Sequence, residues 1–381
     1  MGMKIEQRIW TRTEGWAPSQ EGETGVSAQL VLVFGSTSAL SGTPAVDETR
    51  ARYPDAHVLG CSTAGEIFGT KVLDDSVVTT AIEFASTEIH SASVSVNGHG
   101  GSFQLGAELA RSMPPDGLRH LLVLSDGLRV NGSRLVEGLV SGLPDGITVT
   151  GGLSGDGERF EKTLVVSGGP PESGTIAAVG FYGEDLKIGF GSLGGWDPFG
   201  PERRITRSTA NVLYELDGKS ALDLYKEYLG EHAEGLPSTG LLFPLSVRTQ
   251  EGETGVVRTI ISIDERENSM TFAGNVPEGA YARLMMANFD RLVDGSIGAA
   301  TISRDAIGES PAELAILISC VGRKLVLKQR IEEEVEGVRD VLGDCTPLTG
   351  FYSYGQVSPF GPGATCQLHN QAMTITTLSE R

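Results

Sequence analysis

The sequence has few cysteines, which excludes a disulfide scaffold and argues against a structural metal site. Its 381 residues include only Cys61, Cys320, Cys345 and Cys366, and no Cys-x-x-Cys pair occurs. Four cysteines in a chain of this length do not form a disulfide framework, and zinc sites favour closely paired cysteines. We therefore expect buried thiols in a reducing cytoplasm and no metal.

Positive charge and long apolar runs are also scarce. The 30 Lys and Arg residues face 49 Asp and Glu residues, which gives a formal net charge of −19. Nucleic-acid surfaces and sites that dock on anionic lipid both need clustered Lys and Arg. No apolar run reaches about 18 residues, and the first residues, "MGMKIEQRIWTRTEGW", lack the apolar segment of a secretory signal. The sequence therefore predicts neither nucleic acid nor membrane as a partner.

Familiar nucleotide and hydrolase motifs are missing as well. No G-x-x-x-x-G-K-[ST] phosphate loop occurs, and "FGSTSALSG" after the first apolar run lacks the dinucleotide fingerprint. The stretch "GCSTAG" has the spacing G-x-S-x-x-G, which differs from the G-x-S-x-G of a nucleophile elbow. We expect no cofactor.

Glycine, by contrast, is abundant. The 51 glycines cluster directly after apolar runs, as in "TGGLSGDG" and "GFGSLGGW". Glycine permits tight turns and close approach of the backbone to other atoms. This composition is typical of a β-rich protein with functional loops.

A similar order of segments recurs about four times along the chain. Apolar runs start at Leu30, Leu121, Val212 and Ala315, and each precedes a helix-like segment and a second apolar run. A β-α-β crossover places its two strands in parallel, and β-branched runs such as "VVTTAIEF" then predict antiparallel strands. The sequence therefore predicts an α/β to α+β fold, with duplicated β-α-β-plus-antiparallel-strand units forming mixed sheets in two halves.

The boundary between the two halves is predicted at Gly194–Arg204. This segment, "GGWDPFGPERR", combines Gly, Pro and charge without any periodicity. We therefore expect a first domain at residues 20–195 and a second at residues 205–381.

One Gly-rich turn ends the second strand of three of the four units. Its copies are "GCSTAGEI", "GGLSGDGE" and "GFYSYGQV". Ligands in α/β sheets bind beyond the carboxyl ends of strands, where glycine lets backbone N–H groups come close. Alternatively, the turns only reverse the chain. The turns offer hydroxyl donors for a carboxylate or phosphate and acceptors for an amine: Ser62, Ser154 and Ser353, and Glu66, Asp156 and Gln356.

Other candidates lie near the ends of predicted elements. Tyr352 and Tyr354 are two residues apart on one face of a strand and could form an aromatic wall. Arg129, in "SDGLRVNG", could pair with a ligand carboxylate, or this segment could simply start a helix. His369 and Asn370, in "CQLHNQAMTIT", are either ligand contacts or the solvated face of an edge strand.

These segments resemble the FIST family, the F-box and intracellular signal transduction proteins. "GCSTAGEI" resembles the signature of the FIST N-terminal domain, whereas "LYELDGKSALDLYKEYLG", "GFYSYGQVSP" and "LHNQAMTITTL" resemble the FIST C-terminal domain. The resemblance covers the chain from about residue 25 onward. It implies a cytoplasmic sensory module for a small ligand, such as an amino acid or related metabolite, with a separate signalling protein such as a kinase or cyclase as partner. The chain departs from the family at Ala372, where Thr is usual, and at Gln356, where an acidic residue is usual.

Three functions remain open. A sensor would bind its ligand at the Gly-rich strand ends, whereas an enzyme would use Cys61 as a nucleophile with a depressed pKa. A scaffold would expose an apolar patch and have no well-formed pocket. We favour the sensor, because a lone cysteine at a strand end usually behaves as a small buried hydrophobe. Its expected ligand contacts are Cys61, Ser62, Glu66, Arg129, Ser154, Asp156, Tyr352, Ser353, Tyr354, Gln356, His369 and Asn370.

Overall fold

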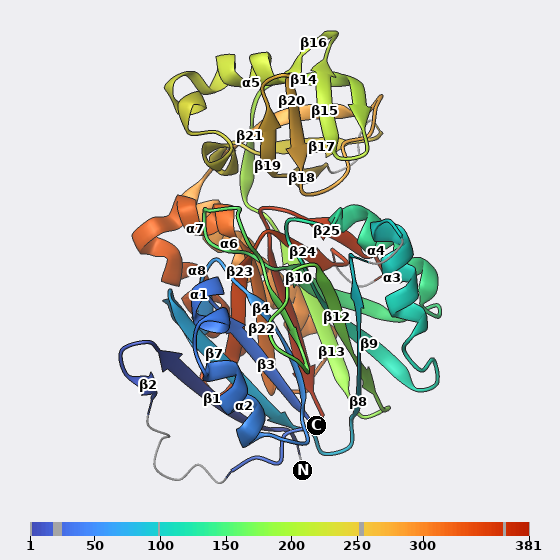
Figure 1. Cartoon of the computed structure of the whole chain (residues 1–381), viewed down its shortest axis with the longest axis vertical. Helices are drawn as coiled ribbons and strands as arrows, with labels where there is room; N and C mark the ends of the chain where they lie inside the picture. The colour runs from blue at the N-terminus through green and yellow to red at the C-terminus, as the bar shows by residue number, and fades with distance from the viewer. Residues whose placement is uncertain (1, 18–24, 98–99, 251–254, 361–362, 381) are drawn as a thin grey trace.

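A body of three mixed sheets carries a smaller lobe above it (Figure 1). The computed structural model describes residues 2–17, 25–97, 100–250, 255–360 and 363–380. Each sheet of the body has six strands, and the lobe has an eight-stranded sheet. The predicted fold class, mixed sheets built from β-α-β units and antiparallel strands in two halves, is confirmed.

The first sheet contains one parallel pair, β3 and β4, among antiparallel neighbours. The run "LVLVFG" of β3 is buried on both faces, as expected where helices cover one face and other sheets the opposite face. Helices α1 (Thr37–Ser41) and α2 (Ala45–Arg52) supply the outer cover. From edge to edge the strands are β11 (Val165–Ser167), β4 (His57–Ser62), β3 (Leu30–Gly35), β7 (Ser76–Glu83), β1 (Lys4–Thr11) and β2 (Gly15–Trp16).

The second sheet repeats this plan, with β9 and β10 as its parallel pair. Helices α3 (Ser102–Arg111) and α4 (Gly132–Gly142) pack against each other and cover its outer face. From edge to edge the strands are β25 (Gln367–His369), β24 (Gly355–Ser358), β10 (Thr148–Leu153), β9 (Leu118–Ser125), β12 (Thr175–Tyr182) and β8 (Glu88–Ser95).

The third sheet follows the same plan around the parallel pair of β22 and β23. Its outer face is covered by α6 (Phe289–Ala306) and α8 (Ile331–Leu342), and α7 (Val321–Leu327) and η3 (Lys328–Arg330) connect β22 to α8. From edge to edge the strands are β13 (Lys187–Leu193), β26 (Met373–Ser379), β22 (Leu314–Cys320), β23 (Leu348–Ser353), β5 (Glu66–Phe68) and β6 (Lys71–Leu73).

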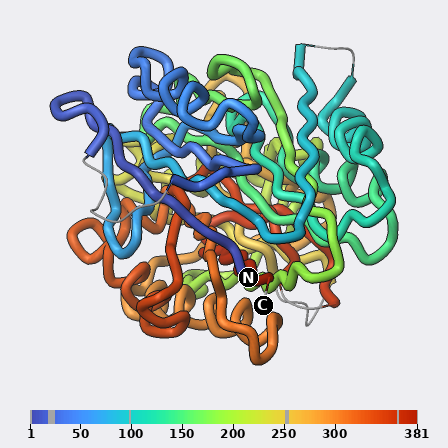
Figure 2. The backbone as a smooth tube through the Cα atoms, turned by 90° about the horizontal axis from the view of Figure 1, so that it is seen from below, coloured from blue at the N-terminus to red at the C-terminus, as the bar shows by residue number. Residues whose placement is uncertain are grey.

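The three sheets exchange strands in a closed cycle. In each unit, the strand that follows the second parallel strand joins the sheet of another unit. Thus β5 pairs with β23, β11 pairs with β4, and β24 pairs with β10. Seen from below, the blue, cyan-green and orange-red parts of the chain surround a common centre (Figure 2). That centre is an apolar core in which the rings of Phe34 and Phe351 lie 4.8 Å apart. No sheet of the body is therefore complete without a segment from another unit.

Close contact between the parallel strands explains part of the high glycine content. Each second parallel strand has a glycine opposite a residue of the first, and a Cβ there would overlap a backbone oxygen. Such a Cβ would lie 2.1 Å from the oxygen of Val33 at Gly60, 1.9 Å from that of Val123 at Gly151, and 1.8 Å from that of Leu317 at Gly350. These glycines are needed for packing between strands rather than for a ligand loop.

The lobe is inserted between β13 and α6 and has its own apolar core. All of its strand pairs are antiparallel. The lobe comprises β14 (Trp196–Thr209), β15 (Val212–Leu216), β16 (Lys219–Ser220), α5 (Ala221–Leu229), η1 (Gly230–Gly235), η2 (Ser238–Leu242), β17 (Leu245–Arg248), β18 (Val256–Arg258), β19 (Ile260–Asp264), β20 (Ser269–Phe272) and β21 (Tyr281–Ala287). Its strand order is β18-β17-β21-β14-β15-β20-β19, and β16 pairs with β15.

The prediction of a β-α-β unit starting at Val212 is therefore wrong. Helix α5 forms as expected, but β15 pairs with β14, β16 and β20, whereas β17 pairs with β18 and β21. The physical reason is burial, because β17 alternates between buried and partly exposed residues and β15 has only two buried residues, Leu213 and Leu216, among its five. Such one-sided strands are typical of antiparallel sheets, whereas parallel strands are buried on both faces.

Three helices of the body, α1, α3 and α6, were not predicted from the sequence. Helix α6 contains Gly, Ser and Thr, which have low helix propensity, and it forms because it packs tightly on the third sheet. A Cβ on Gly295 would lie 1.8 Å from the backbone oxygen of Gly194. Among the helices that the structure describes, none is long and apolar enough to cross a bilayer.

Candidate functional site

The three Gly-rich turns meet in the body, where the sheets exchange strands. Each turn binds the next one through backbone hydrogen bonds, so the three form a ring of protein contacts. The bonds run from Gly155 N to Ser62 O at 2.8 Å, from Ala64 N to Tyr352 O at 2.8 Å, and from Tyr354 N to Leu153 O at 3.1 Å. The turns thus lie together, but these backbone groups form hydrogen bonds with one another.

The predicted hydroxyl donors of these turns are buried and already have partners. Ser62, Ser154 and Ser353 each have no exposed surface. Their Oγ atoms donate to backbone oxygens: Ser62 to Gly155 at 2.7 Å, Ser154 to Ser125 at 2.9 Å, and Ser353 to Ser319 at 3.1 Å. Gln356, predicted to receive an amine, instead donates from Nε2 to the Ser353 hydroxyl at 2.7 Å.

Glu66 is a fully buried carboxyl group at the start of β5. It accepts hydrogen bonds from the Thr63 hydroxyl and from Ser76, whose Oγ lies at 2.7 Å and whose backbone N lies at 3.3 Å. Burial raises the pKa of Glu66 from 4.5 to about 7, against the opposing effect of these hydrogen bonds. Its carboxyl oxygens therefore bind residues of the same unit.

Asp156 and Tyr354 form a second internal contact. The Asp156 carboxylate accepts the backbone N–H groups of residues 160–162 at 2.9–3.0 Å and the hydroxyl of Tyr354. The Tyr354 ring also stacks on Phe160, with centroids 4.6 Å apart. These bonds hold the loop after β10 against the turn after β23.

The two tyrosines do not form one aromatic wall. Tyr352 points into a buried polar cluster, where its hydroxyl donates to Glu334 at 2.7 Å. Glu334 is also paired with the fully buried Arg323 at 2.8 Å. The two rings therefore serve different contacts, because the chain turns after β23 and Tyr354 binds Asp156 instead.

Cys61 lies in the central apolar core with no exposed surface. Burial, together with the nearby Glu66 carboxyl, raises the pKa of its thiol well above the usual range. A thiolate nucleophile requires the opposite shift and access to substrate. The enzyme alternative based on Cys61 is therefore not supported.

The remaining candidates differ in exposure. Arg129 is exposed beside the start of α4. His369 is buried, its Nε2 lies 2.7 Å from the Ser358 oxygen, and burial lowers its pKa to about 4. Asn370 is buried too, and its Oδ1 accepts the backbone N–H of Thr259, in the lobe, at 3.4 Å. His369 and Asn370 therefore do not form the solvated face of an edge strand.

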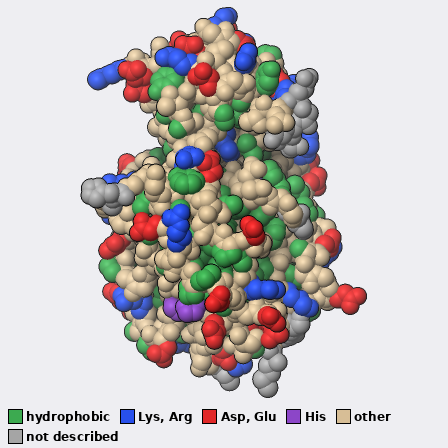
Figure 3. Space-filling view, turned by 90° about the vertical axis from the view of Figure 1, so that its right-hand side faces the viewer, with side chains coloured by type: hydrophobic (Ala, Val, Ile, Leu, Met, Phe, Trp, Pro, Cys, Tyr) green, Lys and Arg blue, Asp and Glu red, His purple; other side chains and the backbone are tan. Residues whose placement is uncertain are grey.

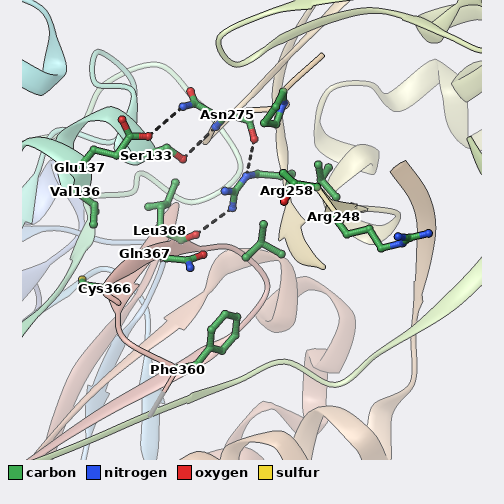
Figure 4. Close-up of a pocket in the computed structure, with 14 residues that line it drawn as sticks. Ser133, Val136, Glu137, Arg248, Arg258, Asn275, Phe360, Cys366, Gln367 and Leu368 are labelled. Atoms are coloured by element: carbon green, nitrogen blue, oxygen red, sulfur yellow. Dashed lines mark hydrogen bonds between the residues drawn. The ribbon is translucent and has the colours of Figure 1, made fainter. Parts of the chain in front are cut away.

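A cavity of about 450 Å³ lies between the lobe and the body. Figure 3 shows the molecule narrowed at this level, with apolar side chains along the waist. The cavity is lined by helix α4, by lobe strands and loops, and by the chain before and within β25 (Figure 4). The lining residues are Ser133, Val136, Glu137, Val247, Arg248, Thr249, Val256, Arg258, Asn275, Pro277, Phe360, Cys366, Gln367 and Leu368.

None of the twelve predicted contacts lines this cavity. The nearest in sequence are His369 and Asn370, which directly follow three lining residues at 366–368. Ligand binding by the twelve residues stays a prediction.

Arg258 is the distinctive residue of the cavity. Only 6% of its surface is exposed, and its guanidinium crosses from the lobe to the body (Figure 4). Nε donates to Asn275 O at 2.9 Å, and Nη1 donates to Leu368 O at 3.0 Å. Burial lowers its pKa to about 10, so it remains charged at neutral pH. Within the described ranges, Arg258 has no carboxylate partner and its Nη2 makes no hydrogen bond.

Asn275 links the lobe to the first turn of α4. Its backbone N donates to Ser133 Oγ at 3.1 Å, its Oδ1 accepts from Asn131 Nδ2 at 3.0 Å, and its Nδ2 lies 3.4 Å from Glu137 Oε1. The adjacent Gly274 permits this close approach, because a Cβ there would lie 2.6 Å from Ser133 Oγ and 3.1 Å from Arg258 Cζ. The positive end of the α4 dipole therefore lies beside the buried guanidinium.

The other charges around the cavity are compensated by neighbours. Arg248 forms a two-point ion pair with Glu202, at 2.6 and 2.5 Å. Glu137 pairs with Arg134 on the same helix. The uncompensated cation and the helix start together make this end of the cavity suited to an anion.

Sequence reasoning missed Arg258, although a signal was present. The residue is a lone cation inside the apolar and β-branched run "VVRTIISI". A charge in such a run is either on an exposed edge or buried for a reason. Its main contact, Leu368, lies 110 positions further along the chain, so the sequence pattern could not show it.

The fold and the site define a two-part, mixed-sheet protein with a cavity between its parts. The chain matches the FIST N domain over residues 29–219 and the FIST C domain over residues 221–359. It therefore belongs to the FIST family, as the sequence motifs predicted. FIST domains are sensory domains of signal transduction.

Two further comparisons give distant similarity. An uncharacterised protein of Methanocaldococcus jannaschii is 27% identical over 207 residues, which is 50% of this chain and 38% of that protein. The chain thus spans well under half the length of this curated relative. The crystal structure of cyanuric acid hydrolase from A. caulinodans aligns over 99% of both chains, with a TM-score of 0.39 and 8% identity.

Proposed function

We propose that this chain is a cytoplasmic sensory module that binds a small carboxylate-bearing ligand, an amino acid or a related metabolite, in the cavity between lobe and body. The observation that carries the proposal is the buried guanidinium of Arg258, which lines the cavity without a carboxylate partner in the described chain. A separate signalling protein, such as a kinase or cyclase, would then respond to the bound state.

The energetics of a buried charge support this role. Removing a cation from water costs several kcal/mol, and carbonyl oxygens compensate only part of that cost. A ligand carboxylate would complete the pairing, because a guanidinium presents several donors in a planar fork. The site without ligand therefore already presents a buried positive charge to an anion.

The position of the cavity suits a sensor. Its lining comes from both lobe and body, so a ligand there would contact both parts at once. A ligand shifts a conformational equilibrium only by the difference in its affinity for the two states. A ligand held by Arg258 of the lobe and by α4 of the body would favour the conformation in which lobe and body are in contact.

The scaffold alternative expected no formed pocket, and the interlobe cavity argues against it. The enzyme alternative relied on Cys61, whose buried thiol has a raised pKa. Binding without turnover is therefore the function that this geometry supports best.

The test is a thermal-shift screen of the full chain with amino acids, organic acids and nucleotides. A ligand at about 100 times its dissociation constant stabilises the native state by about 2.7 kcal/mol. We expect Arg258→Met to lose the response, since removing one partner of a buried charged pair costs about 2–5 kcal/mol of binding.

The matched control is Arg266→Met, which removes the same charge from an exposed position on the lobe. This variant should keep the full ligand response. A ligand that stabilises wild type and Arg258→Met equally would contradict the proposed site.

A further inference from the structure

We infer that the interlobe cavity selects a monocarboxylate whose remaining body is large and apolar, and that it discriminates against dicarboxylates and very small acids. The inference rests on the proposed function, because it assigns the ligand class of the same cavity. It follows from three properties of the lining: its apolar side chains, its one cation that lacks a carboxylate partner among the described residues, and its volume.

Much of the cavity lining is apolar. The side chains that form it come from α4, from the lobe and from the segment around β25, so they surround the cavity from several directions (Figure 4). A ligand bound through its carboxylate would place its other end against them. These apolar lining residues are Val136, Val247, Val256, Pro277, Phe360 and Leu368.

The charged side chains that line the cavity can pair with one negative group of a ligand. Arg258 offers the cation that no described carboxylate satisfies, whereas Arg248 is occupied by Glu202 at 2.5–2.6 Å. Among the described lining residues the acidic one is Glu137, which is paired with Arg134 and offers a second carboxylate no cation. A second ligand carboxylate would therefore lie against Glu137 or against the apolar wall, and both placements are unfavourable.

Glu137 and Arg258 both contact Asn275, which brings their charged groups to the same end of the cavity. Arg258 Nε donates to Asn275 O at 2.9 Å, and Glu137 Oε1 lies 3.4 Å from Asn275 Nδ2. An α-amino carboxylate carries both complementary charges on one carbon. A zwitterion therefore fits this end as well as a simple acid does, and the shared feature of both is one carboxylate on an apolar body.

The volume admits a ligand with a large body. The cavity of about 450 Å³ falls in the range of about 300–1,000 Å³ that is typical of small-molecule sites, so an acid as small as acetate would leave most of it unfilled. Additional apolar groups on the ligand bury further surface against the wall. One methylene in a hydrophobic pocket already changes specificity by about 10- to 200-fold.

The experiment measures dissociation constants by calorimetry for the full chain. The probes are L-phenylalanine, L-leucine, 3-phenylpropanoate, L-alanine, L-aspartate, L-glutamate and 2-phenylethylamine. We expect the large apolar carboxylates to bind at least about tenfold more tightly than L-alanine and the two dicarboxylates. The amine without a carboxylate should not bind.

Comparison of L-phenylalanine with 3-phenylpropanoate distinguishes an amino acid from a simple acid as the ligand. Tighter binding of L-phenylalanine supports the inference with an amino acid as ligand, and tighter binding of 3-phenylpropanoate supports it with a simple acid. Tightest binding of L-aspartate, L-glutamate or L-alanine, still lost in Arg258→Met, would overturn the inference while leaving the proposed function intact. Failure of every probe, or equal binding in Arg258→Met, would count against both.

A designed change of specificity gives a second, independent readout. Val256→Lys places a new cation in the apolar wall, and we expect it to bind L-glutamate at least about tenfold more tightly than wild type does. The control is Val257→Lys, the next residue of β18, which points to the other face of the strand and does not line the cavity. Equal gains in both variants, or no gain in Val256→Lys, would contradict the inference.

Discussion

At the scale of single residues, burial determines what the candidate side chains do. The hydroxyls of Ser62, Ser154 and Ser353 have the residue types of a binding site, but each donates to a backbone oxygen inside the protein. Buried polar groups require such partners, so a recurring serine in a turn is a weak indicator of a ligand. Arg258 is the more informative residue, because its charge is buried and lacks a carboxylate partner among the described residues.

Glu66 makes stability depend on pH. Burial raises its pKa from 4.5 to about 7, so the folded protein holds this proton more tightly than the unfolded chain does. The resulting stability is fully present below pH 4.5 and is lost as the pH rises to about 7. Its size is about 3 kcal/mol.

We expect Glu66→Gln to remove this contribution. The difference in unfolding free energy between wild type and variant should fall by about 3 kcal/mol between pH 4.5 and pH 7. Urea denaturation at several pH values measures it. The buried His120 and His369, whose pKa values are lowered, act in the opposite direction but are present in both proteins and cancel. A difference that is constant with pH would show that Glu66 does not titrate in this range.

At the scale of elements, parallel strand pairs and exchanged segments define the body. Local pattern identified β3, β9 and β22 from their apolar runs, and β4, β10 and β23 as the runs that follow the helix-like segments. It did not identify where β5, β11 and β24 pair, since each joins the sheet of another unit. Short strands carry little pattern of their own, and their partners are set by tertiary packing.

Gly350→Ala tests the close contact of β22 and β23. The new Cβ would lie 1.8 Å from the backbone oxygen of Leu317, and neither backbone can move without disturbing the parallel pair. We expect a loss of about 3 kcal/mol in unfolding free energy, measured by urea denaturation. Gly25→Ala, where no atom lies within 4 Å of the new Cβ, should change stability by less than about 0.5 kcal/mol. A Gly350→Ala variant as stable as the control would contradict the strand spacing.

At the scale of the whole molecule, the lobe is an insertion with its own core. Its two ends lie side by side, since Trp196 in β14 pairs with Ala287 in β21. The lobe also contacts the body, where Leu241 joins a core cluster of the body and accepts a hydrogen bond from Gln371 Nε2 at 2.8 Å. The body and the lobe are therefore separable in sequence but coupled in space.

Replacing residues 197–286 with a short Gly-Ser linker tests this organisation. We expect the three-sheet body to remain folded, with reduced stability, and to lose all carboxylate binding because Arg258 and half of the cavity lining are removed. Circular dichroism and a thermal melt report folding, and calorimetry reports binding. A shortened chain that is unfolded would show that the body requires the lobe, and retained binding would place the site elsewhere.

The sequence by itself determined the fold class, the main buried strands, helices α2, α4, α5 and α8, and membership in the FIST family. These features depend on patterns within about 20 neighbouring residues or on motifs read directly from the chain. Only the tertiary structure decided the exchange of strands, the insertion of the lobe and the position of the cavity. The reason is that these features arise from contacts between distant residues, as between Arg258 and Leu368 or between Ser133 and Asn275. A single sequence records the residue types at such a contact but not that they meet.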